Sequence, residues 1–141
     1  MRICAVIDTN VLVSALLSKH RDAATVRVLR AMLNGGFIPL YHRDILEEYA
    51  EVMRRPKFRL ADREIEMVLE SIRRYGLEVE PHPTGEPFVD ADDLIFYEVA
   101  MEKRDEDAWL VTGNQRHFPV KPFIVTPAEF MAMLEGDVTR K

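Results

Sequence analysis

The sequence lacks the features that mark disulfide-rich, membrane-spanning and secreted proteins. It contains one cysteine, Cys4, among 141 residues, and a single thiol forms neither an internal disulfide nor a cysteine-based zinc site. Its longest apolar stretch, residues 11–17, is interrupted by Ser14 and is far too short to cross a bilayer. The N-terminal residues reach Asp8 too early to contain the apolar region of a signal peptide. We therefore expect a protein of the reducing cytoplasm without a membrane partner.

The sequence also lacks repeats, low-complexity tracts and an excess of basic residues. It carries 19 Lys and Arg against 24 Asp and Glu, a net charge of −5. This balance argues against a protein that coats nucleic acid through charge alone, but it permits an enzyme that approaches phosphate through a metal ion. The length and the 48% hydrophobic content are typical of one globular domain. We expect that domain to span residues 1–141, with residues 135–141 as a C-terminal tail.

Strand-like and helix-like segments alternate along the chain. Short apolar runs predict strands, and apolar residues three and four positions apart predict helices. The expected strands cover residues 3–7, 37–41, 77–80, 108–111 and 123–125. The expected helices cover residues 11–17, 22–33, 44–55, 65–72, 94–102 and 127–136. This alternation predicts an α/β fold in which helices cover both faces of a mostly parallel central sheet.

Acidic and amide side chains stand where ligands bind in such a fold, after the strands. Asp8 follows the first expected strand, and Asn114 follows the fourth. Asp93 lies in the loop before the fifth expected helix, beside Asp90 and Asp92, which we expect to be loop or capping acids. We expect Asp8 and Asp93 to approach each other at one edge of the sheet, together with Glu48 of the helix over residues 44–55.

The helix over residues 44–55 supplies a further acid. At about 100° per residue, Glu48 lies at the edge of the apolar arc, whereas Glu47 and Glu51 point toward solvent. Two carboxylates about 4 Å apart repel by roughly 4 kcal/mol at an effective dielectric constant near 20, so an acidic cluster needs a cation. Oxygen ligands without cysteine or paired histidine select Mg²⁺ or Mn²⁺. Considered singly, however, Glu48 could be a solvated surface acid, and the acids after the strands could be helix caps.

Four segments together resemble the PIN-domain ribonucleases. They occur in the family's order and spacing, and the resemblance extends from residue 2 to about residue 134. The segments are VIDTNVLVSAL (6–16), ILEEYAEVMRRPKF (45–58), DADDLIFYEVA (90–100) and LVTGNQRHFP (110–119). The resemblance implies a three-layer α/β/α fold and a site for one or two divalent metal ions. RRPKF and TGNQRHF are most similar to VapC-like toxins of type II toxin–antitoxin pairs.

The resemblance also implies roles for individual residues. The family's first three acids, which bind metal and act in catalysis, correspond by position to Asp8, Glu48 and Asp93. Asn114 stands where an acid often follows Thr-Gly, and its amide oxygen contributes no charge but can still contact water or metal. Asn10 and Thr112 correspond to polar side chains that orient the ligating carboxylates.

Basic and aromatic side chains near the expected site are candidates to bind RNA. Phosphate contacts position a substrate without reading its sequence, and the basic candidates are Arg54, Arg55, Lys57, Arg59, Arg116 and His117. The first four could equally form the solvated end of a helix. Recognition of single-stranded RNA usually adds aromatic stacking, for which the candidates are Tyr41, His42, Phe58 and Phe118.

The combined expectation is an endoribonuclease that hydrolyses RNA phosphodiester bonds with Mg²⁺ or Mn²⁺. By resemblance it is a toxin, with a cognate antitoxin and a second copy of the chain as partners. A haloacid-dehalogenase-type phosphatase needs an acid where Asn10 stands, and a receiver domain needs an acidic pair where Ile7 and Asp8 stand. The glycine motifs of nucleotide-binding enzymes are absent. A PIN-like domain that binds RNA or protein without cleavage is the stronger alternative, because Asn114 replaces the fourth acid.

Overall fold

A five-stranded parallel sheet forms the centre of the computed structural model, which describes residues 2–88 and 90–139. Its strands are β1 (Cys4–Ile7), β2 (Ile38–Tyr41), β3 (Leu77–Glu78), β4 (Trp109–Val111) and β5 (Ile124–Val125). They lie in the order β3-β2-β1-β4-β5, and each pairing between them is parallel. The predicted α/β class with a mostly parallel sheet is confirmed.

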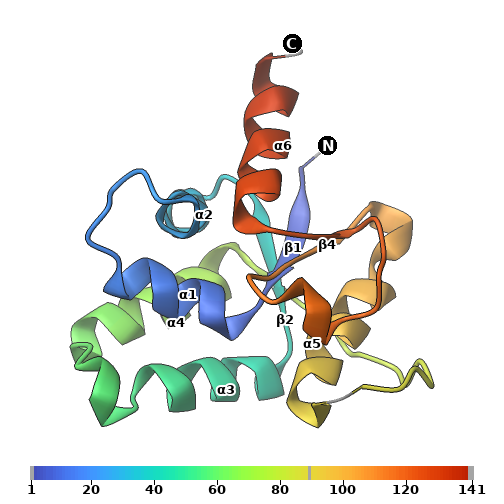
Figure 1. The fold of residues 1–141 in the computed structure, drawn as a ribbon, viewed down its shortest axis with the longest axis horizontal. Coiled ribbons are helices and arrows are strands. Elements are labelled where there is room, and N and C mark those ends of the chain that lie inside the picture. Colours follow the sequence, from blue (N-terminus) through green and yellow to red (C-terminus); the bar gives the residue numbers. More distant parts are fainter. Residues whose placement is uncertain (1, 89, 140–141) are drawn as a thin grey trace.

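Helices cover both faces of this sheet. They are α1 (Thr9–Leu17), α2 (Ala24–Leu33), α3 (Arg43–Met53), α4 (Asp62–Tyr75), α5 (Ala91–Glu102) and α6 (Pro127–Thr139). Helix α5 lies on one side of the sheet, and α1, α2 and α4 lie on the other (Figure 1). The result is the expected three-layer α/β/α arrangement. Within the described residues, no helix is both long enough and apolar enough to cross a membrane.

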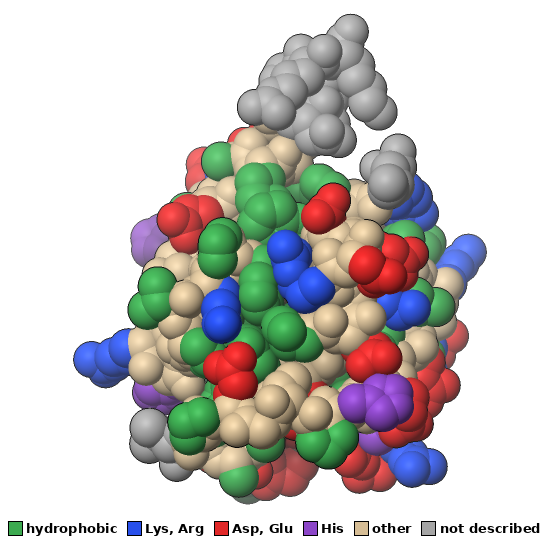
Figure 2. All heavy atoms as spheres, turned by 90° about the vertical axis from the view of Figure 1, so that its right-hand side faces the viewer, with side chains coloured by type: hydrophobic (Ala, Val, Ile, Leu, Met, Phe, Trp, Pro, Cys, Tyr) green, Lys and Arg blue, Asp and Glu red, His purple; other side chains and the backbone are tan. Residues whose placement is uncertain are grey.

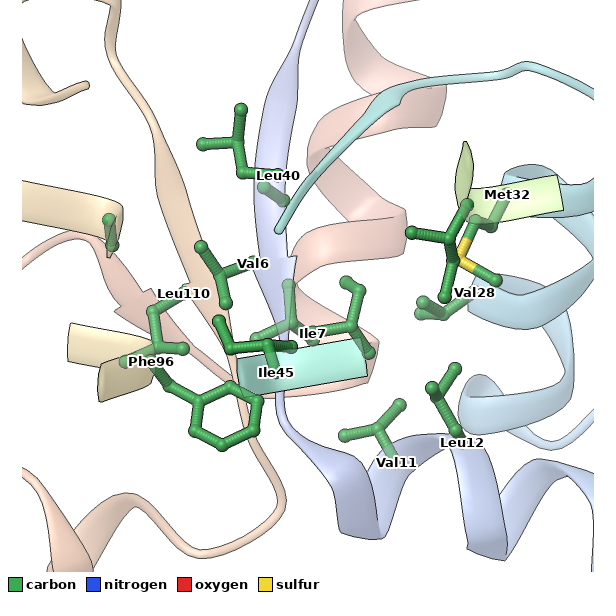
Figure 3. Close-up of a cluster of buried hydrophobic side chains, with 14 of the residues drawn as sticks. Val6, Ile7, Val11, Leu12, Val28, Met32, Leu40, Ile45, Phe96 and Leu110 are labelled. Carbon is green, nitrogen blue, oxygen red and sulfur yellow. The ribbon is translucent and has the colours of Figure 1, made fainter. Parts of the chain in front are cut away.

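The core forms on the two sides of β1, the central strand. Ala5, Val6 and Ile7 are at most 1% exposed, as expected for a parallel strand covered on both faces. Side chains of α1 and α2 pack on one side of β1, and Phe96 of α5 packs on the other (Figure 3). The core therefore fixes β1 between two layers of helices. Because Asp8 directly follows β1, its backbone position is fixed as well.

Helices α1, α3, α4 and α5 begin earlier than predicted, and the differences at α1 and α5 affect the acids. Helix α1 begins at Thr9, directly after Asp8, rather than at residue 11. Helix α5 begins at Ala91 rather than at residue 94, because the side chain of Asp90 accepts a hydrogen bond from the backbone N–H of Asp92 at 2.9 Å. Asp93 therefore lies in the first turn of α5, and the placement of this residue in a loop was wrong.

The predicted end of the last helix at Gly136 was also wrong. The start is as expected: the backbone N–H of Thr126 donates to Glu129 Oε1 at 2.8 Å, and that of Glu129 donates to Thr126 Oγ1 at 3.1 Å. Helix α6 continues through Gly136 to Thr139, because a glycine within a helix costs only about 1 kcal/mol relative to alanine and does not force an end. Residues 135–139 are thus helical rather than a tail, and residues 140–141 lie outside the described residues.

Gly76 is the glycine on which the packing of α4 against the sheet depends most. A Cβ atom at this position would lie 2.3 Å from the carbonyl oxygen of Ile72 and 2.6 Å from that of Pro39. We expect Gly76→Ala to lower the free energy of unfolding by about 1–3 kcal/mol, because backbone atoms must shift. In Gly136→Ala, where the new Cβ meets no atom within 4 Å, stability should stay equal or rise by up to about 1 kcal/mol. Urea denaturation measures both, and equal stabilities of the two variants would contradict this packing.

Candidate active site

The strand order places a crevice between β1 and β4. Strands β2 and β3 continue the sheet on one side of β1, and β4 and β5 continue it on the other. This reversal is the point at which parallel α/β sheets bind ligands, beyond the carboxyl ends of the strands. Ile7 of β1 is paired in register with Val111 of β4. The residues that follow, Asp8 and Thr112, therefore lie side by side.

A chain of hydrogen bonds fixes Asp8 in the crevice. Its backbone N–H donates to the carbonyl oxygen of Val111 at 2.9 Å, which continues the sheet pairing by one residue. Its carboxylate accepts a hydrogen bond from the hydroxyl of Thr112 at 2.7 Å. The same hydroxyl accepts from the backbone N–H of Asn114 at 2.9 Å. Thr112 thus couples the orientation of the Asp8 carboxylate to the turn that carries Asn114.

Asp8 lies in a buried environment that disfavours the charged form of its carboxylate. Only 6% of the residue is exposed, and this burial raises the pKa of its carboxyl group, although the Thr112 hydroxyl opposes the shift. Asp8 occupies the N-cap position of α1, where the backbone N–H groups of Thr9 and Asn10 lower its pKa, although its side chain forms no regular capping hydrogen bond. A capping role alone therefore does not explain why a carboxylate is buried here.

Glu48 is the acid of α3 that turns toward Asp8. Its side chain is half-buried, whereas Glu47 and Glu51 are exposed, as the helical phase predicted. The hydroxyl of Thr9 donates a hydrogen bond to the Glu48 carboxylate. Glu51 instead pairs with Arg55 at 3.1 Å. The contact from Thr9, the neighbour of Asp8 in sequence, holds Glu48 beside the crevice.

Mutual repulsion adds to burial at the acids of the crevice. Burial raises the pKa of Glu48, and the charges of Asp8, Asp92 and Asp93 raise it further. The pKa of Asp93 is raised to about 6, first by burial and then by the charges of Asp8 and Asp90. His117 partly opposes this shift, since its Nδ1 lies 3.6 Å from Asp93 Oδ2. Asp8, Glu48 and Asp93 therefore lie within one electrostatic field, in which a cation would be favoured.

These side chains surround a pocket of about 270 Å³. It is lined by Asp8, Thr9, Asn10, Val13, Val52, Phe58, Asp90, Asp93, Asn114 and His117. The structure thus brings Asp8, which follows β1, and Asn10 of α1 together with Asp93 of α5 and with Asn114, which follows β4. Glu48 does not line the pocket directly and reaches it through Thr9.

Two buried oxygen atoms in this pocket have no hydrogen-bond partner among the described residues: Asn10 Oδ1 and Asp93 Oδ2. Buried polar atoms are nearly always hydrogen-bonded, so an unpartnered pair points to an absent ion or water. Among the described residues, no three Asp, Glu, His or Cys side chains form a complete metal-binding group. Mg²⁺ usually binds through one or two carboxylates and keeps several waters. The oxygens present therefore fit a partly hydrated ion held chiefly by Asp8 and Asp93.

The basic candidates are only partly available to RNA. Arg54 pairs with Asp62 at 3.8 Å and with Glu66, and Arg55 pairs with Glu51. Three other candidates make no ion pair with an acid among the described residues, and all three are exposed: Lys57, Arg59 and Arg116. Of the six basic candidates, His117 is the one that lines the pocket. On the face that carries α5, Lys and Arg side chains are scattered among acidic ones (Figure 2).

The structure separates the four aromatic candidates. Phe58 lines the pocket, whereas Tyr41 lines a different groove, between α3 and α4. His42 caps α3, with Nδ1 accepting from the backbone N–H of Asp44 at 3.1 Å. Phe118 is buried in the core and packs edge-on against Phe88. The expectation that His42 and Phe118 are free to stack on RNA bases was therefore wrong.

Sequence reasoning missed two side chains that support the acids. Thr9 binds Glu48, and its position directly after Asp8 was the only signal for this contact. Tyr49 of α3 is buried, and its hydroxyl donates to the carbonyl oxygen of Ile7, the last residue of β1. Burial, with the nearby charges of Asp8 and Glu48, raises the pKa of Tyr49 well above its usual value. A buried tyrosine hydroxyl needs a partner, and this rule could have prompted a search for one.

Comparison with known proteins agrees with this architecture. The family model described as "PIN domain" matches residues 4–116, which include the expected acids and Asn114. No protein of curated function matches the chain. PIN domains are in general nucleases, and they typically use divalent metal ions. Since the match covers most of the chain, this protein belongs to the PIN-domain family.

Proposed function

We propose that this protein is a divalent-metal-dependent endoribonuclease that hydrolyses RNA phosphodiester bonds. The observation that carries the proposal is the pocket at the ends of β1 and β4. There, Asp8 is buried and Asp93 is half-buried, the pKa values of both are raised, and a buried oxygen of Asp93 lacks a hydrogen-bond partner among the described residues. Structural carboxylates are normally paired or hydrogen-bonded. Carboxylates kept in an unfavourable state at a ligand-binding edge are characteristic of functional sites.

Each acid has a distinct role in the proposed reaction. Asp8 and Asp93 would hold Mg²⁺ or Mn²⁺, which when bound activates water and neutralises charge on the phosphoryl oxygens. Glu48 would be a further ligand or would orient the attacking water, and Thr9 fixes its carboxylate for either role. Asn114 would position water without adding charge. The hydroxyl of Thr112 keeps the Asp8 carboxylate aimed at the pocket.

Asn114 keeps a second function open, that of a PIN-like domain that binds RNA or protein without cleaving it. An amide at this position removes one negative charge from the site and weakens its attraction for a second metal ion. Three acids are nevertheless retained, and so we favour cleavage. A toxin role in the cytoplasm, a cognate antitoxin and a homodimer remain proposals that rest on the segments RRPKF and TGNQRHF.

A cleavage assay with matched glutamine variants tests the reaction. We expect the full-length protein to cut a labelled single-stranded RNA panel in Mg²⁺ or Mn²⁺ and to stop in EDTA. Glu48→Gln should lower the rate by at least about 100-fold, because a ligand or water-orienting group is lost. Glu47→Gln, one residue away on the exposed side of α3, removes the same charge and should cleave like the unchanged protein.

Asp8→Asn should abolish the same cleavage. Activity that persists in EDTA or in Asp8→Asn would exclude the proposed mechanism. If Glu47→Gln lowers the cleavage rate as much as Glu48→Gln does, the effect comes from the loss of a negative charge on α3. Glu48 would then have no specific role in the reaction.

The electrostatic strain at Asp93 predicts a pH-dependent gain in stability for Asp93→Asn in metal-free buffer. Its folded-state pKa of about 6 lies above an unfolded value of about 3.9. The folded protein is therefore favoured by protonation of Asp93, and this stabilisation is present below about pH 4 and lost as the pH rises through 6. Asparagine does not titrate, so the Tm of Asp93→Asn relative to the unchanged protein should rise between pH 4 and pH 7.

The exposed residue Asp22 provides the control, because Asp22→Asn should show no such trend. Thermal unfolding followed by circular dichroism measures all three proteins. A Tm of Asp93→Asn that lies several degrees below that of the unchanged protein at pH 7 would mean that Asp93 is structural.

A further inference from the structure

The pocket that holds the acids also has an apolar wall. Val13 comes from α1, Val52 from α3, and Phe58 from the 3₁₀ turn Pro56–Phe58 that follows α3. These three side chains come from separate segments and meet at the same pocket as Asp8. A site for a hydrated metal ion and a phosphate alone has no need of an apolar wall, since both ligands are strongly polar.

Phe58 is well placed to contact a ligand in this pocket. Its ring is half-buried, so part of it stays open to solvent. The turn that carries it is fixed by hydrogen bonds from the backbone N–H of Phe58 to Arg55 O at 3.0 Å and from that of Arg59 to Pro56 O at 3.1 Å. The ammonium group of Lys57 lies 5.1 Å from the centre of the Phe58 ring. The ring is therefore presented by a hydrogen-bonded turn, with an exposed basic group beside it.

We propose that Phe58, Val13 and Val52 form a subsite for an unpaired nucleobase next to the phosphodiester that is cleaved. The inference rests on the proposed nuclease function and names the side chains that would hold the base beside the cleaved bond. A nucleotide joins a flat, largely apolar base to an anionic phosphate, and the pocket joins an apolar wall to acids that would bind a metal ion. A base stacks on an aromatic ring whatever its identity.

Base pairing would prevent this contact. The faces of the bases in a duplex are already covered by their neighbours, and recognition by stacking requires bases that are splayed out. Lys57 leads the chain into Phe58 and makes no ion pair with a described residue. Its ammonium group can leave the ring when a base stacks there and can contact the adjoining phosphate. The subsite therefore selects unpaired nucleotides without selecting a sequence.

Binding of a fluorescent RNA tests the subsite. The probe is a short single-stranded RNA with one 2-aminopurine, whose fluorescence falls when the base stacks. Full-length Asp8→Asn, which should not cleave the probe, serves as the parent protein. We expect saturable quenching by the parent. Adding Phe58→Leu, which keeps an apolar side chain but loses the ring, should raise Kd about tenfold, and Phe58→Trp should restore tight binding.

Phe88→Leu in the same parent is the matched control. Phe88 is also half-buried, but it packs against Tyr97 and Phe118 and does not line the pocket. The Phe88→Leu substitution should therefore leave the Kd for the probe unchanged. The probe in a fully paired duplex should bind about tenfold more weakly than the single strand. An unchanged Kd in Phe58→Leu, or equal affinity for the duplex, would overturn the subsite.

Cleavage is scored separately, so the two proposals can fail independently. Phe58-dependent binding without RNA hydrolysis by the unchanged protein contradicts the nuclease but supports the base subsite. Metal-dependent hydrolysis together with a Kd that is the same in the parent and in Phe58→Leu supports the nuclease and overturns the subsite.

Discussion

The parallel pairing of β1 with β4 is the constraint on which the site depends. It sets Ile7 beside Val111, and so Asp8 emerges next to Thr112 at the carboxyl edge of the sheet. The buried hydroxyl of Tyr49 holds the carbonyl of Ile7 from α3, the same helix that carries Glu48. The positions of Asp8 and Glu48 are therefore set by the buried central strand and by the helix that is hydrogen-bonded to it. A catalytic geometry built on such elements is more accurately fixed than one built on loops alone.

Folding concentrates negative charge in the crevice without neutralising it within the chain. Burial raises the pKa values of Asp8, Glu48 and Asp93, and the charges of neighbouring acids raise those of Glu48 and Asp93 further. This opposes folding of the metal-free protein, and the extensive core on both sides of β1 offsets it. A hard cation bound in the proposed site would favour the charged forms of these carboxylates and so would relieve this opposition to folding. The hydroxyls of Thr9 and Thr112 orient the acids without cancelling their charge, which preserves their attraction for metal.

Much of the fold followed from patterns that span a whole element. The alternation of strands and helices predicted the parallel sheet, and the phase of α3 predicted that Glu48, rather than Glu47, turns inward. Local competition decided the features that were missed. Asp90 is the N-cap residue of α5, and this earlier start places Asp93 within the helix. Helix α6 continues through Gly136 because one glycine destabilises a helix by only about 1 kcal/mol. Contacts such as Thr9 with Glu48 and Tyr49 with Ile7 join residues about 40 positions apart, and no periodic pattern encodes them.

We propose that a metal ion completes the site of Asp8 and Asp93, whose carboxylates make no ion pair with a Lys or Arg among the described residues. Crystals of the full chain grown with Mn²⁺ test it most directly, through an anomalous difference map. We expect a Mn²⁺ peak in the pocket, within bonding distance of carboxylate oxygens of both Asp8 and Asp93, and we expect this peak to be lost in Asp8→Asn. A map at saturating Mn²⁺ with these two side chains in the same orientation and no peak between them would contradict it.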